Sequence, residues 1–259
     1  MHNLLRDYRV EVSESELYRA LGYPDSDSVS GPVHEICLEQ LRRLDDFIAP
    51  WAGSHEVRID GVDDDSVRLE SGRTLTSRRL ATILRRATSL RICLVTVGPG
   101  IMPEVERLMA AGAMVEALAL DAAASAAASA LMAELRARIC AQATERNCGT
   151  TLRYAPGYTG WTIQDTPTLF SYLDEESMPI RLNQQLMMIP AKSLLGVIGI
   201  VPGGRSAAHE TPPCRLCDLE RCAVRLAPYQ TTRNRAAPEE RNATSEVERA
   251  QGEVPGPHL

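Results

Sequence analysis

The sequence has few aromatic side chains, no excess of positive charge and no long uninterrupted apolar run. Only 4% of its 259 residues are aromatic, so aliphatic residues and methionine must fill the core that a 44% hydrophobic composition allows. The formal net charge of −6 argues against a nucleic-acid-binding protein, whose binding surface is basic. The best apolar run, 186–201, is interrupted by Pro190 and Lys192 and is too short to span a membrane.

Two further absences bear on location and chemistry. The N-terminus lacks the apolar stretch and small-residue cleavage site of a secretory signal, so we expect a cytoplasmic protein. The five histidines are scattered, and no Ser-His-Asp or Cys-His arrangement stands out among them. The sequence therefore indicates no hydrolytic site.

Three of the seven cysteines form a cluster. Cys214, Cys217 and Cys222 stand within nine residues of a Pro-rich segment, and a C-x2-C turn brings two sulfurs to the same side. The spacing predicts one metal centre, either an iron–sulfur cluster, which we favour, or zinc. The fourth ligand could be Cys148, His209 or a residue of a partner. Three other cysteines occupy apolar positions and are expected in the core: Cys37, Cys93 and Cys140.

Periodicity predicts a mixed α and β fold whose strands are too far apart for an obvious βαβ repeat. Ser13 and Glu16 form a capping box that opens a short helix. Segments 57–60 and 67–69 alternate like two strands around an acidic turn. The other expected elements are a helix within 32–48, a helix opening at Thr76-Ser77, a buried strand at 91–97, a very long Ala-rich helical region from Pro103 to about Asn147, and a second buried strand at 195–201.

Gly98-Pro99-Gly100 follows one of these strands and precedes a helix, where a dinucleotide-binding loop would stand. The third glycine of that motif is replaced by Pro103, and no acidic residue clearly ends a following strand. We therefore expect a structural turn here and no nucleotide site.

Two downstream motifs point to a ligand. Arg153-Tyr154-Ala155-Pro156-Gly157-Tyr158 combines a rigid fork of donors, a turn and an aromatic ring, which suits a small zwitterion with a carboxylate and a ring. The second motif, M-x-P-x-x-S, runs from Met188 to Ser193. In this order they resemble the activation (S-adenosylmethionine-binding) domain of cobalamin-dependent methionine synthase. Within that family the chain resembles the free-standing members with a C-terminal C-x2-C-x4-C cluster, and the resemblance covers roughly residues 14–226.

This resemblance implies an α+β fold, with a twisted, mainly antiparallel sheet flanked by helices and a helical N-terminal region. It also implies an S-adenosylmethionine site. Arg153 would bind the methionine carboxylate, backbone around Ala155 would read the adenine edge, and the sulfonium would lie beside an aromatic face. The residues matched to this site are Arg153, Ala155, Pro156, Gly157, Tyr158 and Ser193.

The chain departs from methionine synthases beside this site. Val197 and Ile198 stand where an aromatic pair follows the second motif, and Asn183-Gln184-Gln185 replaces an acidic pair before it. Lys192 is a new cation there, equally consistent with a surface lysine whose stem lies along apolar surface. The pocket is therefore expected to differ on this side.

The function implied by the resemblance is reductive reactivation of a corrinoid methyltransferase, in which bound S-adenosylmethionine donates its methyl group to cob(II)alamin. No D-x-H-x-x-G cobalamin-binding motif is visible, so the cobalamin would be held by a partner, either a corrinoid protein or a methionine synthase lacking its own activation domain. The cysteine cluster could relay an electron from a donor such as a flavodoxin or ferredoxin. The alternative is a non-catalytic S-adenosylmethionine-sensing or assembly module with a structural metal knuckle. Neither function involves nucleic acid or a membrane.

We expect four segments along the chain. An N-terminal helical and small-strand region covers 1–90, and the activation-like domain covers 91–204. The cysteine-cluster segment covers 205–229. The remaining residues, 230–259, lack apolar periodicity and are expected to be a disordered tail.

Overall fold

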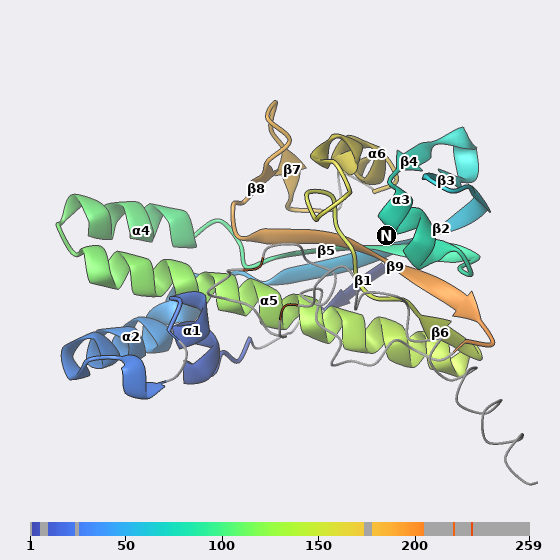
Figure 1. Cartoon of the computed structure of the whole chain (residues 1–259). Helices are drawn as coiled ribbons and strands as arrows, with labels where there is room; N and C mark the ends of the chain where they lie inside the picture. The colour runs from blue at the N-terminus through green and yellow to red at the C-terminus, as the bar shows by residue number, and fades with distance from the viewer. Residues whose placement is uncertain are drawn as a thin grey trace, which may run out of the picture.

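The computed structural model describes residues 2–5, 10–23, 26–173 and 178–204, together with Glu220 and Tyr229. These residues form a seven-stranded sheet with one long helix, α5 (Met114–Glu145), along one face and shorter elements on the other (Figure 1). All of the pairings in the sheet are antiparallel. The predicted α+β fold with a mainly antiparallel sheet is therefore confirmed.

The strand order of the sheet is β4-β3-β2-β5-β9-β6, and β1 pairs with the first part of β2. The strands are β1 (His2–Leu5), β2 (Trp51–Val62), β3 (Ser66–Leu69), β4 (Thr74–Thr76), β5 (Ser89–Thr96), β6 (Cys148–Thr150) and β9 (Ser193–Pro202). A separate hairpin joins β7 (Arg181–Leu182) to β8 (Met188–Ile189). The first 90 residues thus contribute β1 to β4 to the same sheet as β5 and β9.

The two central strands, β5 and β9, are buried on both faces. Leu90 and Ile92 of β5 pack into the core under α3 and α6, whereas Cys93 and Val95 pack against α5. The sequence of a strand that is covered on both sides is a continuous apolar run, because neither face has to be polar. This is why the sequence predicted both strands, and the structure confirms them to within a few residues.

The helices fall into two groups. Those around the N-terminal half of α5, which extends beyond the sheet (Figure 1), are α1 (Glu14–Ala20), α2 (Gly31–Arg43) and α4 (Ile101–Ala110). Those on the sheet face opposite α5 are α3 (Arg78–Leu84) and α6 (Thr166–Phe170). Short 3-10 turns are η1 (Ser26–Ser28), η2 (Leu44–Asp46), η3 (Glu70–Gly72) and η4 (Ile163–Asp165).

Two predicted helix caps are present. The Oγ of Ser13 accepts from the backbone N–H of Glu16, and the Glu16 carboxylate accepts from the Ser13 N–H at 2.8 Å, which completes the capping box. The Oγ of Ser77 accepts from the Leu80 N–H at 3.1 Å and caps α3.

The alanines of α5 reflect its packing on several sides. Its first half packs against α1, α2 and α4, and its second half lies on the sheet through Leu131, Leu135 and Ile139. Alanine favours helix and leaves room for close neighbours. Among the described residues, α5 is the one helix long and apolar enough to cross a membrane, but 56% of its most apolar window is buried inside the protein. That burial is typical of a core helix.

The helical region expected from Pro103 onward is not continuous. The N–H groups of Gly112 and Ala113 donate to the carbonyls of Met109 and Leu108, at 3.0 Å each, in a Schellman motif that ends α4. Gly112 has φ 79°, which glycine adopts without strain. Apolar, helix-favouring residues continue on both sides of this glycine, so the sequence pattern does not indicate the break.

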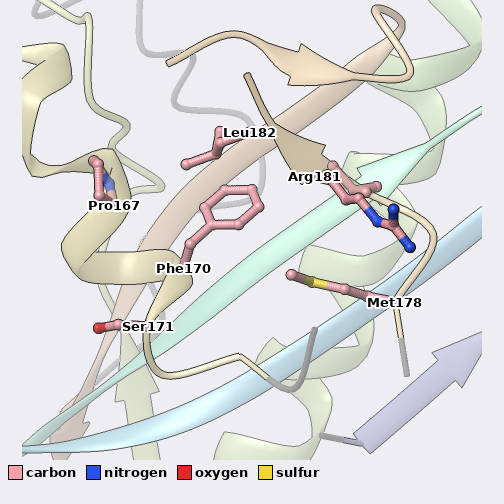
Figure 2. Close-up of a pocket in the computed structure, with 7 residues that line it drawn as sticks. Pro167, Phe170, Ser171, Met178, Arg181 and Leu182 are labelled. Carbon is pink, nitrogen blue, oxygen red and sulfur yellow. The ribbon is translucent and has the colours of Figure 1, made fainter. Parts of the chain in front are cut away.

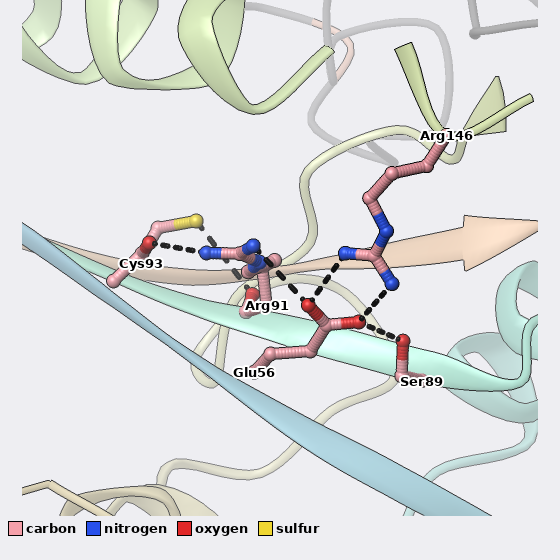
Figure 3. A network of polar contacts seen from close by, with 6 residues as sticks. Glu56, Ser89, Arg91, Cys93 and Arg146 are labelled. Carbon is pink, nitrogen blue, oxygen red and sulfur yellow. Dashed lines mark hydrogen bonds and ion pairs between the residues drawn. The ribbon is translucent and has the colours of Figure 1, made fainter. Parts of the chain in front are cut away.

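Glu56 on β2 connects the sheet to the residue that follows α5 (Figure 3). Its carboxylate accepts from Arg146 Nη1 at 2.9 Å and Ser89 Oγ at 2.6 Å, and it pairs with Arg91 Nη2 at 3.1 Å. Burial opposes the charge of Glu56, but these partners outweigh the burial and lower its pKa. The network therefore holds the C-terminal end of α5 against β2 and β5.

A second carboxylate joins α4 to α2. Glu104 is 8% exposed and accepts from Arg107 Nε at 2.7 Å and Arg43 Nη2 at 2.9 Å. The hydrogen bonds from Arg107 outweigh the burial and, together with the one from Arg43, lower the pKa of Glu104 to about 2. Glu104 is therefore ionised in the folded protein over most of the acid range.

We expect acid to destabilise the protein in part through Glu104. A carboxyl group whose pKa is lowered by folding contributes stability that is fully present above its unfolded pKa of about 4.3. That stability is lost as the pH falls toward the folded pKa of about 2. Urea unfolding between pH 6 and pH 3 should therefore show a steeper loss of stability in the wild type than in Glu104→Gln.

The control for this experiment is Glu39→Gln, because Glu39 pairs with Arg42 on the surface of α2 and is 54% exposed. This variant should keep the wild-type pH dependence, since exposed pairs contribute little. If Glu104→Gln and the wild type lose stability equally with acid, the assigned role of Glu104 is wrong.

Candidate functional site

The first motif forms a turn beside the edge of β9. Tyr154 and Val197 exchange two backbone hydrogen bonds, of 3.0 and 2.7 Å. A β-turn follows, closed by the N–H of Tyr158 donating to the carbonyl of Ala155 at 3.1 Å. Gly157 occupies its third position with φ 88°, which a type II turn requires there. The predicted Pro-Gly turn is therefore present.

Arg153 is held by β9 and by Tyr158. Its Nη1 donates to the carbonyl of Leu195 at 3.0 Å and its Nη2 donates to the Tyr158 hydroxyl at 2.6 Å. The guanidinium carbon also lies 5.5 Å from the centroid of the Tyr158 ring. A guanidinium carries five N–H donors, so these two hydrogen bonds leave others for an anion.

Two buried aromatic rings lie beneath this turn. Tyr154 and Trp161 are stacked with an interplanar angle of 4° and centroids 6.1 Å apart, and each is 2% exposed. Tyr158 meets Tyr154 edge-on at 5.6 Å. The position of the Tyr158 ring is thus set by this edge contact and by Arg153.

Asp165 connects the turn to β4, which lies at the opposite edge of the sheet from β6. Its Oδ2 accepts from Trp161 Nε1 and from the Thr76 N–H, both at 2.8 Å. Ser77 adds a hydrogen bond to the Gly160 carbonyl at 2.7 Å. The sequence does not indicate this role of Asp165, because its partner Thr76 is 89 positions away along the chain.

The second motif folds at the start of β9. Ser193 is buried, and its Oγ donates to the carbonyl of Pro190 at 2.7 Å, within the motif itself. Leu195, the acceptor for Arg153, follows two residues later. β9 therefore brings the two motifs together. Arg153 and Tyr158 touch directly, whereas the Ser193 hydroxyl is engaged in its own turn.

Lys192 is a partner in an ion pair. Its Nζ lies 2.8 Å from Asp121 Oδ1, donates to Ser125 Oγ at 2.9 Å, and belongs to a side chain that is 15% exposed. Both partners belong to α5. Lys192 therefore ties the beginning of β9 to α5 and does not lie free along the surface.

The Gly98-Pro99-Gly100 turn is closely packed by backbone. A Cβ at Gly100 would lie 2.4 Å from the Phe47 carbonyl oxygen, and one at Gly98 would lie 2.9 Å from the Ala49 nitrogen. The Ala49 N–H also donates to the Val97 carbonyl at 2.7 Å. Segment 47–49 occupies the space beside both glycines, which agrees with the predicted structural turn.

A pocket of about 280 Å³ opens between α6 and β7 (Figure 2). Phe170, Met178 and Ile180 contribute apolar side chains to its lining and belong to the same core as Tyr154. The complete lining is Pro167, Phe170, Ser171, Met178, Ile180, Arg181 and Leu182. None of the predicted site residues is among them.

The predicted metal ligands Cys214, Cys217 and Cys222, like His209, lie outside the described residues, so the metal centre stays a prediction. Within the described residues, no group of three or more His, Cys, Asp or Glu side chains could hold a metal ion. Cys148 is half-buried on β6, opposite Pro202. The cysteines expected in the core are buried there: Cys37, Cys93 and Cys140. Burial raises the pKa of the Cys93 thiol to about 12.

The comparisons with known proteins bear on the fold. No protein-family model matches the sequence, and no curated protein matches it. The structure is similar to a crystal structure of the MetH reactivation domain bound to AdoHcy, with a TM-score of 0.55 and 15% sequence identity. The match covers 78% of this chain and 77% of that chain. This likeness shows the fold, and it is the fold that the two motifs predicted.

Replacing Asp165 by alanine should loosen the turn. The buried Trp161 would lose the acceptor of its Nε1–H, at a cost of roughly 1–3 kcal/mol in the free energy of unfolding, and the exposed Thr76 N–H would lose the same acceptor. In a Trp51→Phe background the remaining tryptophan fluorescence reports on Trp161, and its emission should shift. Asp64→Ala is the control, because the Asp64 side chain is 97% exposed. Equal stability and emission in the two variants would contradict this role of Asp165.

Proposed function

We propose that the protein binds S-adenosylmethionine and reactivates a corrinoid methyltransferase partner, donating the methyl group to cob(II)alamin held on another subunit. One observation carries the proposal. The Arg153 guanidinium is fixed at the edge of β9 beside the Tyr158 ring, in a fold similar to that of a reactivation domain bound to AdoHcy. A cationic fork next to a ring suits a ligand with a carboxylate and a sulfonium.

We assign the ligand's groups to the turn as follows. Arg153 binds the methionine carboxylate, the Tyr158 ring lies beside the sulfonium, and backbone around Ala155 reads the adenine edge. Pro156 and Gly157 shape the turn that presents these groups. Ser193 keeps the second motif folded through its bond to the Pro190 carbonyl.

The proposed reaction couples a one-electron reduction to a methyl transfer. Cob(II)alamin takes up one electron from a low-potential donor, and the carbon–sulfur bond of the sulfonium breaks as the methyl group binds cobalt. The products are methyl-cob(III)alamin and S-adenosylhomocysteine. The methyl transfer makes an unfavourable reduction effectively irreversible, and the contribution of this chain is to position the methyl donor over the docked corrinoid.

The cysteine cluster is our candidate for the group that transfers the electron. We propose that Cys214, Cys217 and Cys222 hold an iron–sulfur centre that relays the electron from a flavodoxin or ferredoxin, with zinc as the alternative metal. Cys148 is our candidate for the fourth ligand. In support, it lies opposite Pro202 at the end of β9, and the cysteine segment follows that strand in the chain.

Arg153→Ala should weaken binding of S-adenosylmethionine by roughly 1.5–3 kcal/mol, the scale of a charge-assisted hydrogen bond. Arg153→Lys should give an intermediate loss, because it keeps the charge without the planar fork. Arg58→Ala is the control, since Arg58 is 69% exposed and pairs with Asp60 on β2. Titration calorimetry measures all three. Equal affinity of the wild type and Arg153→Ala would remove the ligand assignment.

Mixed with its corrinoid partner in the cob(II) state, with a low-potential reductant and S-adenosylmethionine, the protein should form methyl-cob(III)alamin. The absorbance change of the corrinoid reports this product. A variant with all three clustered cysteines replaced by serine should bind S-adenosylmethionine normally, lack the metal and react more slowly. If S-adenosylmethionine binds and no methyl-cob(III)alamin forms, the sensing or assembly function replaces this one.

A further inference from the structure

We infer that Gly196 is a positioning residue for Arg153: the space left by its missing side chain holds the arginine stem and sets where the guanidinium points. A Cβ on Gly196 would lie 2.8 Å from Arg153 Cγ, 2.9 Å from its Nη1 and 3.0 Å from its Cδ. These separations are shorter than carbon atoms tolerate without displacement. Any side chain at position 196 would therefore push the arginine off the strand.

The glycine is required for space and not for its backbone conformation. Gly196 lies within β9 and is not among the residues with positive φ, so the backbone there could accept an alanine. Glycine inside a strand weakens it and often marks the close approach of another group. Here the approaching group is the Arg153 side chain.

Three consecutive residues of β9 together define the position of Arg153. The carbonyl of Leu195 accepts from its Nη1, Gly196 leaves room for its stem, and Val197 pairs with the backbone of Tyr154 next to it. The Tyr158 hydroxyl holds the other end of the guanidinium. Because the arginine is fixed at its backbone and at its tip, a Cβ beneath its stem must displace the tip or break a hydrogen bond.

Gly199 offers a matched control in the same strand. A Cβ there would lie 2.6 Å from Leu84 Cδ2, 2.9 Å from Thr151 Cγ2 and 3.0 Å from Ala87 Cβ. The crowding is as severe as at Gly196, but none of these neighbours is Arg153. The two glycine-to-alanine substitutions therefore differ in whether they move the guanidinium.

The first test is a stability cycle that needs no ligand. Gly196→Ala should lower the urea midpoint in the wild-type background and lower it much less, or not at all, in Arg153→Ala, where the space is free. Gly199→Ala should lower it equally in both backgrounds. If Gly196→Ala alone does not fold, recovery of folding in the double variant supports the inference. An equal loss in both backgrounds, or no recovery, would overturn it.

The second test is ligand selectivity, and it rests on the proposed function. Gly196→Ala should weaken S-adenosylhomocysteine binding by about tenfold or more, the scale of one charge-assisted hydrogen bond. It should leave 5′-methylthioadenosine, which has no carboxylate, bound as by the wild type. Equal losses for both ligands would mean a merely structural role. If the wild type binds neither ligand, the proposed function fails, and the stability cycle still decides the role of Gly196.

Discussion

The pairing of β5 with β9 is the constraint on which the rest of the structure depends. The two strands are in register over eight residue pairs, from Ser89 opposite Ile200 to Thr96 opposite Ser193, and both of their faces are buried. Burying apolar surface on two sides is the main favourable contribution to folding. Because each face must be covered, α5 lies on one side and α3 with α6 on the other. The candidate site forms where β9 extends past β6, the strand that pairs with its outer edge.

The candidate site shows how a buried strand can still present polar chemistry. In the described residues, β6 pairs only with the end of β9, and Tyr154 adds one bridge at Val197. Toward the start of β9 a side chain takes the place of a neighbouring strand on the outer edge, since Arg153 donates a hydrogen bond to the Leu195 carbonyl. The guanidinium is thereby fixed by backbone that is itself locked into the sheet. A group held in this way is oriented before a ligand arrives, which lowers the entropic cost of binding.

Much of the local structure followed from the sequence, because its causes are local. The capping box at Ser13, the cap at Ser77 and the Pro-Gly turn at 156–157 each depend on residues a few positions apart. The two buried strands were visible as apolar runs. Where the local pattern was ambiguous the prediction failed, as at Gly112, which ends α4 within a continuous helix-favouring segment. Strand β1 was missed, since its pairing with β2 depends on residues about fifty positions away.

The sequence by itself determined the two central strands, the α+β class and the two motifs that name Arg153, Tyr158 and Ser193. Only the tertiary structure decided which of these meet. It joined Arg153 to Leu195, supported Trp161 through Asp165, and gave Lys192 its partner on α5. It also showed that Gly196 leaves the space for Arg153. The reason is physical: spacing along the chain fixes turns and caps, whereas contacts between distant residues exist only after the sheet has brought them together.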